Sequence, residues 1–336
     1  MNFAVDLWLL ACAALQANSH PHRITGYRKT RRGNTDLETY IGELSALGAA
    51  FSFALASTTF TLAGRKFGAT MSMALSLQIS LVFLVLMHQA LLGEAFPSSA
   101  SLERWIFLGA SSLSGYVVSS VMLLRSFQYI GPRLAMLIGS ITPIVAALLA
   151  WIFLGQGLSS IAVFGIVVVV AGIGWVVSDD AGRDLRMKNA NYSRGLALAV
   201  GSAIGQGASF TLMSEGVAGG FHAMSAGVIR TLVGLVILWL VIVARGKLRE
   251  NLQLIRAEPR ALLVLTFASL VGPVIGTTLI LLSLQYTSVG ISSTLTGTTP
   301  ILLIPIGYIV FADKITLRAV IGTMIAIAGV ALLFAA

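Results

Sequence analysis

Ten apolar segments of nearly bilayer length constrain the fold of this chain more than any other feature. A membrane-spanning helix needs about 20 predominantly apolar residues. The segments that meet or approach this length are 41–63, 70–93, 105–124, 134–154, 160–177, 195–214, 221–244, 261–284, 288–312 and 319–336. Only two of them contain a formal charge: Glu43 at the start of the first and Arg230 well inside the seventh. The sequence therefore predicts an all-α integral membrane protein with ten transmembrane helices.

The composition argues against several other classes of protein. Charged residues make up 10% of the 336 positions, whereas a soluble globular domain carries about 25%. A soluble enzyme and a nucleic-acid-binding protein are therefore disfavoured, and the net charge of +9 is better explained by loop charges that set membrane orientation. Cys12 is the only cysteine, which excludes an intrachain disulfide and a multi-cysteine metal site.

An internal repeat relates the two halves of the chain. Phe107 to Val177 aligns with Val264 to Phe334 at a constant offset of 157 residues and without gaps. The identities include Gly115 with Gly272, Ser126 with Ser283, Gln128-Tyr129 with Gln285-Tyr286, Thr142-Pro143 with Thr299-Pro300, Gly165 with Gly322 and Gly172 with Gly329. Apolar composition alone does not readily produce this set. We therefore expect a first five-helix repeat over 41–177, a connecting loop over 178–194 and a second five-helix repeat over 195–336.

The number of helices in each repeat has a geometric consequence. Five crossings are odd, so the second repeat would begin on the opposite side of the membrane and the two repeats would be inverted. Inverted repeats around a site near the membrane midplane are common in secondary transporters. Residues 1–40 lie outside the repeats, and no positive residue precedes their apolar stretch, as a signal peptide would require. For this segment we expect a disordered or interfacial tail.

The repeated motifs resemble a known family. The stretch from Leu123 to Thr142-Pro143, followed by Leu154-Gly155-Gln156 and Gly165, looks like the EamA domain of the drug/metabolite transporter superfamily, and so does its counterpart from Leu281 to Gly322. The resemblance implies a ten-helix carrier of the inner membrane, and many such carriers export amino acids or other small metabolites. The family usually has glutamate after the fourth and ninth helices, where this chain has Gln156 and Asp313.

Arg230 is the strongest single indication of a functional site. Counted from Phe221, it lies nine residues, or about 14 Å, inside its predicted helix. A charge at that depth costs about 2.5 to 3.5 kcal/mol on insertion scales, and no carboxylate lies at a matching depth in another predicted span. Arg230 is expected either to line a cavity and bind substrate or to be satisfied by carbonyls and hydroxyls within the bundle. Gln78, near the equivalent position of the second helix, and Tyr116 are candidates for the same substrate-binding wall.

Two prolines at equivalent positions predict kinks that could act as gates. Pro143 and Pro300 lie in the middle of the predicted fourth and ninth helices, and each crowds the carbonyl four residues back, at Gly139 and Thr296. The freed carbonyls need partners in lipid, and Thr142 and Thr299 offer hydroxyls at this level, either to the helix or to a substrate.

These features predict a secondary-active transporter, in the direction of export, that moves a small amino acid-like or anionic metabolite by alternating access. The alternatives are an accessory membrane subunit, a membrane enzyme without a recognisable catalytic motif, or a channel. No metal-binding, aspartyl-protease or phosphate-binding motif is present, so we expect no enzymatic activity, cofactor or metal. The expected partners are the solute and membrane lipid, without nucleic acid, and the expected state is a monomer or homodimer.

Two arguments give opposite orientations of the chain in the membrane. If cytoplasm precedes residue 41, the inner side holds six basic residues and the opposite side fifteen. The positive-inside rule therefore favours both ends of the ten-helix core outside, whereas the family resemblance implies both ends inside.

Overall fold

The computed structural model describes residues 40–67, 69–184, 192–246, 257–299, 301–302 and 317–334, and all the regular structure in these ranges is helical. The predicted tail, except for Tyr40, and Pro300 lie outside the described residues. The first half contains α3 (Ile41–Phe67), α4 (Ala69–Leu92), α5 (Leu102–Ser112), η1 (Leu113–Ser119), α6 (Ser120–Gly139), α7 (Thr142–Leu154) and α8 (Ser160–Asp184). The second half contains α9 (Tyr192–Gly216), η2 (Ala218–Gly220), α10 (Ala223–Ala244), α12 (Pro259–Ser269), η3 (Leu270–Gly276), α13 (Thr277–Tyr286), α14 (Val289–Thr296) and α16 (Leu317–Phe334).

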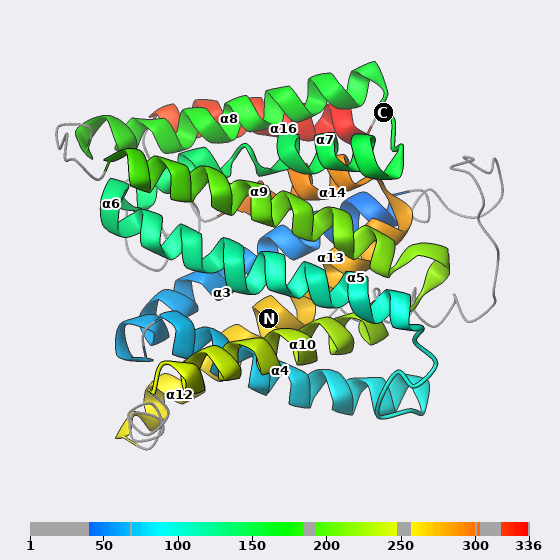
Figure 1. Cartoon of the computed structure of the whole chain (residues 1–336). Helices are drawn as coiled ribbons and strands as arrows, with labels where there is room; N and C mark the ends of the chain where they lie inside the picture. The colour runs from blue at the N-terminus through cyan, green and yellow to red at the C-terminus, as the bar shows by residue number, and fades with distance from the viewer. Residues whose placement is uncertain are drawn as a thin grey trace.

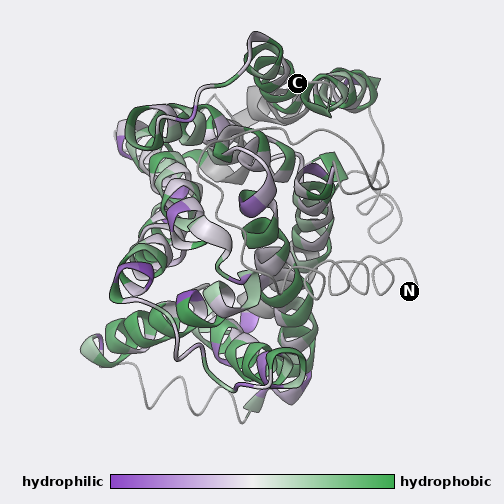
Figure 2. Cartoon of the chain, turned by 90° about the vertical axis from the view of Figure 1, so that its right-hand side faces the viewer, coloured by the Kyte–Doolittle hydropathy of each residue, from purple (hydrophilic) through white to green (hydrophobic). Residues whose placement is uncertain are grey.

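Several helices have the length and hydropathy of membrane spans. Within the described residues, five helical runs qualify, with mean hydropathies between 1.4 and 2.5: Thr70–Leu92, Leu102–Leu123, Tyr192–Gly216, Ala223–Ala244 and Pro259–Tyr286. Large apolar side chains such as Trp151, Phe153 and Leu240 are more than 60% exposed. Figure 2 shows that hydrophobic residues cover most of the described helices. The outer surface is therefore suited to hydrocarbon rather than to water.

The helix boundaries repeat with the predicted offset of 157. Adding 157 to the bounds of α5, 102 and 112, gives 259 and 269, which are the bounds of α12. The same addition converts the bounds of η1, 113 and 119, into those of η3, 270 and 276. Both η1 and η3 are single stretches of π-helix, and such stretches inside α-helices are frequent at functional sites.

The predicted kinks are complete helix breaks. α6 ends at Gly139 and α14 ends at Thr296, which are again 157 residues apart. Pro143 lies in the first turn of α7 rather than in the middle of a continuous 134–154 helix. Proline is tolerated at this position because an N–H group in the first turn of a helix has no acceptor within the helix, so its absence costs no hydrogen bond. The predicted 178–194 loop also differs in part, since α8 continues to Asp184.

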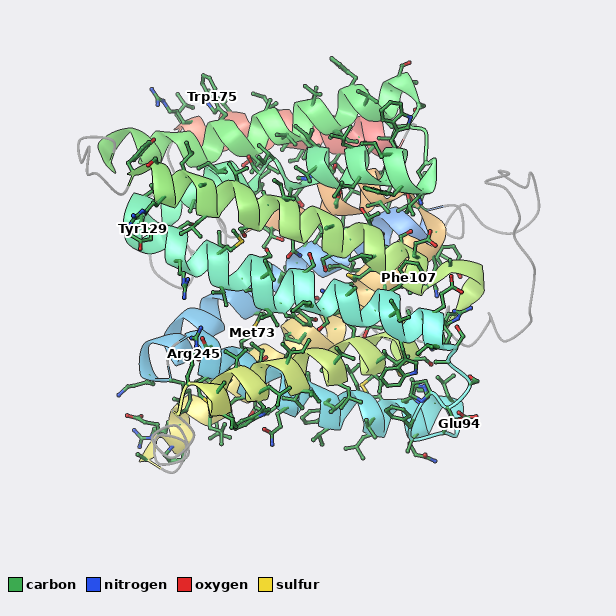
Figure 3. All side chains as sticks on the ribbon, in the orientation of Figure 1. Met73, Glu94, Phe107, Tyr129, Trp175 and Arg245 are labelled. Carbon is green, nitrogen blue, oxygen red and sulfur yellow. The ribbon has the colours of Figure 1, made fainter. Side chains whose placement is uncertain are left out.

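The molecule has two ends, which we name after Glu94 and Arg245, and both residues are labelled in Figure 3. At the Glu94 end, the side chain of Gln285 donates a hydrogen bond to the carbonyl of Phe221, just before α10. Gly42, near the start of α3, lies against Thr287, and Gly216, at the end of α9, lies against Leu108 of α5, which begins at this end with Leu102. α3 therefore begins at the end where α9 finishes, and the two helices run in opposite directions (Figure 1).

Helices α8 and α16 pack in a reciprocal way. A Cβ atom on Gly172 would lie 2.8 Å from the carbonyl oxygen of Gly322, and one on Gly165 would lie 3.2 Å from that of Gly329. Gly322 is the repeat counterpart of Gly165, and Gly329 is that of Gly172. Gly172 thus contacts the counterpart of Gly165, and Gly165 contacts the counterpart of Gly172. A two-fold relation between antiparallel helices produces this pattern. The small residues let the two backbones approach closely.

The close approach of α8 and α16 can be tested with Gly172→Ala. The added Cβ would lie 2.7 Å from the backbone nitrogen of Ala326, which cannot move without separating the helices. We expect a loss of about 1 to 3 kcal/mol, typical of overpacking, measured as a lower unfolding temperature of the purified protein in detergent. Gly157→Ala is the control, because nothing lies within 4 Å of its added Cβ. Equal unfolding temperatures for the two variants would contradict this packing.

Candidate functional site

Arg230 is buried inside the helix bundle and bonds to three hydroxyl groups. It lies seven residues, or about 10 Å, beyond the start of α10, and only 3% of it is exposed. Its Nε donates to Ser111 Oγ at 3.2 Å, Nη1 to the Tyr116 hydroxyl at 2.9 Å and Nη2 to Ser209 Oγ at 3.1 Å. The guanidinium therefore bonds to side chains of α5, η1 and α9.

A second set of hydrogen bonds holds these hydroxyls in place. Ser111 Oγ donates to the carbonyl of Leu108 at 2.7 Å, and Ser209 Oγ donates to the carbonyl of Ser111 at 2.8 Å. The Tyr116 hydroxyl lies 3.2 Å from Thr277 Oγ1 at the start of α13. The network thus joins residues from both halves of the chain.

The π-helix η1 brings Tyr116 to Arg230. The Tyr116 ring also covers the guanidinium, whose central carbon lies 4.1 Å from the ring centroid, in a cation–π arrangement. A Cβ atom on Gly115 would lie 3.0 Å from Arg230 Nη2, and one on Gly234 would lie 3.0 Å from the Tyr116 ring. Both glycines are therefore needed for the close fit between η1 and α10.

The charge of Arg230 is not neutralised by any described residue. In the ranges that the structure describes, no carboxylate forms an ion pair with it, and all three of its bonded partners are neutral. The described hydroxyls occupy three of its five N–H donors. The nearby hydroxyl of Ser112 is buried without a hydrogen-bond partner among the described residues. The structure thus shows the expected hydroxyl partners of the guanidinium, whereas substrate binding by Arg230 stays a prediction.

Gln78 does not belong to this cluster. It is exposed on α4, whereas its neighbour Leu77 is fully buried. Contacts with equivalent residues indicate which residue is the counterpart of Arg230. Ser112 and Ser269 are counterparts in the repeat. Gly234 packs against Ser112, and Ser80 donates a hydrogen bond to the carbonyl of Ser269, so Ser80 and Gly234 occupy equivalent positions. The offset between α4 and α10 is therefore 154, which pairs Arg230 with Ser76. The sequence comparison missed this register because the loop after the second helix of each repeat differs in length.

The predicted residues near the helix breaks lie apart from Arg230. Thr299 Oγ1 donates to the carbonyl of Thr296 at 2.7 Å, so this hydroxyl satisfies the last carbonyl of α14. A Cβ atom on Gly297 would lie 3.4 Å from Pro143, so the two breaks meet each other. α9 lies between the breaks and the arginine, because Gly207 packs on α7 while Ser209 bonds to Arg230 from the opposite face of α9. Thr142 and Gly139 are half-buried beside Pro143.

The Glu94 end of α4 and α10 is held together by histidine contacts. His88 is 2% exposed, and its Nδ1 donates to the carbonyl of Glu94 while its Nε2 lies 2.8 Å from Ser225 Oγ. His222 precedes α10, and its Nδ1 accepts the backbone N–H of Met224. Burial, and then the neighbouring His88, lower the pKa of His222. A lowered pKa favours the neutral imidazole, which is the form that can accept this bond.

Two residues of the site escaped the sequence analysis. Ser111 and Ser209 are ordinary serines in predicted spans, and serine is common at helix contacts. The repeated Gly115 was the available signal, since a glycine in a span marks a place where another group approaches closely. Among the described residues, no group of three or more His, Cys, Asp or Glu could hold a metal ion.

The fold and the site together define a polytopic membrane protein with a cationic site inside its helix bundle. The model of the EamA-like transporter family matches residues 40–178 and 193–335. The chain belongs to this family, so it is a membrane transporter of the drug/metabolite transporter superfamily with two EamA repeats. A solved structure titled "Crystal structure of protein" has the same fold, with a TM-score of 0.67 and 15% identity over 89% of this chain and 96% of that chain. No curated protein matches the chain.

The stability of Arg230→Met tests what the arginine does for the fold. Methionine has a similar length and no charge to desolvate, and buried charges are often replaced by apolar residues at no cost. Ser111 and Ser209 keep their carbonyl acceptors in this variant. We expect an unfolding temperature equal to or above that of the wild type. Thr231→Val is the matched control on the same helix, because it removes a buried hydroxyl without a described partner. A marked loss of stability confined to Arg230→Met would show that the arginine holds the bundle together.

Proposed function

We propose that this protein is a secondary-active transporter that binds a small organic anion at Arg230 and moves it by alternating access. The observation that carries the proposal is a buried guanidinium whose charge no described carboxylate neutralises. Charged groups within membrane spans are costly and commonly mark substrate or ion pathways. A carboxylate on the solute would replace neutral hydroxyls as the partner of the guanidinium, and charge-assisted hydrogen bonds are about twice as strong.

Inverted repeats over 41–177 and 195–336 would supply the alternation. The opposite directions of α3 and α9 and the reciprocal contacts of α8 and α16 support an inverted relation. In such a fold, exchange of the conformations of the two halves converts a site open to one side into a site open to the other. The two helix breaks at Gly139 and Thr296 lie at equivalent positions and provide points at which the halves can bend.

Membership in the family supports an exporter of the inner membrane, in which the solute and lipid are the partners. The hydroxyl network of Ser111, Tyr116 and Ser209 would hold the empty arginine between transport cycles. The solute then competes with hydroxyls that belong to three different helices, so binding is coupled to their arrangement. This coupling is what a carrier requires, because a ligand shifts a conformational equilibrium only through differential contacts with the two states.

Counterflow in proteoliposomes tests the proposed function. A panel of radiolabelled carboxylates, amino acids and neutral metabolites is offered to vesicles that contain only this protein. We expect saturable counterflow of at least one carboxylate, and a loss of at least tenfold in Arg230→Met, because a charged hydrogen bond contributes about 1.5 to 3 kcal/mol.

Thr231→Val is again the matched control and should retain the wild-type rate. Carboxylate counterflow at the wild-type rate in Arg230→Met would remove the arginine from the mechanism. Flux that does not saturate and shows no counterflow would contradict a carrier and indicate a channel.

A further inference from the structure

An apolar groove opens on the surface beside the Arg230 site, on the side of the Arg245 end. Its volume is about 230 Å³. The apolar walls come from η1, the start of α6 and the second half of α10, through Val117, Val118, Val121, Met122, Leu238 and Val241. Val118 is 43% exposed, so the groove is open towards the surroundings of the bundle. In a bilayer these surroundings are hydrocarbon, and the groove suits an apolar chain or ring.

The groove also has two polar lining residues, and both lie at the ends of their helices. Thr70 lies in the first turn of α4, and Arg245 follows the last residue of α10. Arg245 is exposed and forms no ion pair with another described residue, whereas Lys66 at the same end is paired with Glu258 at 2.8 Å. The groove therefore combines an apolar length with a cation at its mouth that no carboxylate of the described residues neutralises. This combination is complementary to a molecule that has a hydrocarbon part and an anionic group.

The groove points towards the buried arginine. Arg230, Gly234, Leu238, Val241 and Arg245 follow one another at intervals of three or four residues and so share one side of α10. The two arginines are fifteen residues apart, or about 22 Å along the helix axis.

Two residues of the groove wall, Val117 and Leu238, belong to the same apolar cluster as the aromatic ring that covers the buried arginine. Val117 follows Tyr116 directly in η1. A Cβ atom on Gly234 would lie 3.0 Å from the Tyr116 ring and 3.1 Å from Leu77. The Tyr116 ring therefore contacts both the apolar cluster that holds Val117 and Leu238 and the Arg230 guanidinium, whose central carbon lies 4.1 Å from the ring centroid.

The opposite end of α10 is closed by direct contacts. His88 bridges Ser225 and the carbonyl of Glu94, Gln285 bonds to the carbonyl of Phe221, and Arg104 lies 4.4 Å from the Phe221 ring centroid. A solute that entered from this nearer end would have to separate these contacts, whereas the groove lies along α10 on the side of the Arg245 end.

We infer that the groove is an entry path to Arg230 and that the substrate is an amphipathic organic anion, with one carboxylate-like group and an apolar body. Arg245 attracts the anionic group at the membrane surface, and the valine, leucine and methionine walls take up the apolar body. Displacement of the Tyr116 ring then exposes Arg230, to which the anionic group passes. The transport step of this inference rests on the proposed function, but occupation of the groove does not.

Photolabelling tests the occupant of the groove. The probe is a ten-carbon carboxylate with a terminal diazirine, applied to the full-length protein in proteoliposomes, and the control probe is the matched ten-carbon alcohol. Labelled peptides are identified by mass spectrometry. We expect the carboxylate to label peptides that contain Val117 to Met122 and Leu238 to Arg245. We expect Arg245→Gln to reduce this labelling about fivefold, since one basic residue near a membrane surface contributes about 1 kcal/mol to the attraction of an anion.

Two neighbouring tryptophan substitutions provide the steric test. Val241→Trp fills the groove and should remove the labelling, whereas Leu240→Trp lies on the lipid-exposed side, where 63% of Leu240 is exposed, and should leave it unchanged.

Equal labelling by the alcohol, or labelling insensitive to both Arg245→Gln and Val241→Trp, would overturn the inference and identify a slot for bulk lipid. Failure of the proposed function has a different signature, namely carboxylate counterflow that is independent of Arg230.

Discussion

Arg230 is a positive charge buried without a negative partner among the described residues, and α5, η1, α9 and α10 meet around it. Arg230 is 3% exposed in a helix of spanning length, and in the described chain only hydroxyl groups accept its hydrogen bonds. To supply these acceptors, α5, η1 and α9 must all approach α10 at one level. Gly115 and Gly234 permit this approach because any side chain at either position would enter the space of Ser209, Arg230 or Tyr116. The site is therefore organised by the arginine rather than placed in a pre-existing cavity.

The sequence predicted the parts of the fold that follow from local patterns. The offset of 157 correctly related α5 and η1 to α12 and η3, because no insertion separates them. It did not predict that α6 is one helix through residues 125–133, which were expected to connect two spans, whereas its counterpart is divided into α13 and α14. Gly139 and Thr296, four residues before the two prolines, are the last residues of α6 and α14, so helices end where kinks were predicted, and a gating role stays a prediction. The charge pattern identified Arg230 as a charge deep within a predicted span, and Tyr116 was recognised as a polar residue within a span.

The predictions from sequence were wrong where they depended on how helices far apart in the chain align with each other. Gln78 was misplaced because α4 and α10 follow an offset of 154 that only contacts reveal. Ser111 and Ser209 were missed because their importance comes from the partner they meet and not from their own chemistry. Thr142 and Thr299 were candidates for binding the substrate, but α9 lies between them and Arg230. Each error concerns which face of a helix meets which neighbour, and hydropathy alone cannot give that information for a helix that is apolar on all sides.

Arg230 is proposed to bind an anion, and ligand-induced stabilisation of the purified protein measures such binding directly. A ligand that binds only the folded state raises the unfolding temperature, and the rise grows with the ratio of the ligand concentration to its Kd. The purified protein is heated in detergent with increasing concentrations of carboxylates and their matched amides, in the wild type and in Arg230→Met. The account predicts that at least one carboxylate raises the unfolding temperature of the wild type, that its amide does not, and that the shift disappears in Arg230→Met. A carboxylate that stabilises both proteins equally would contradict it.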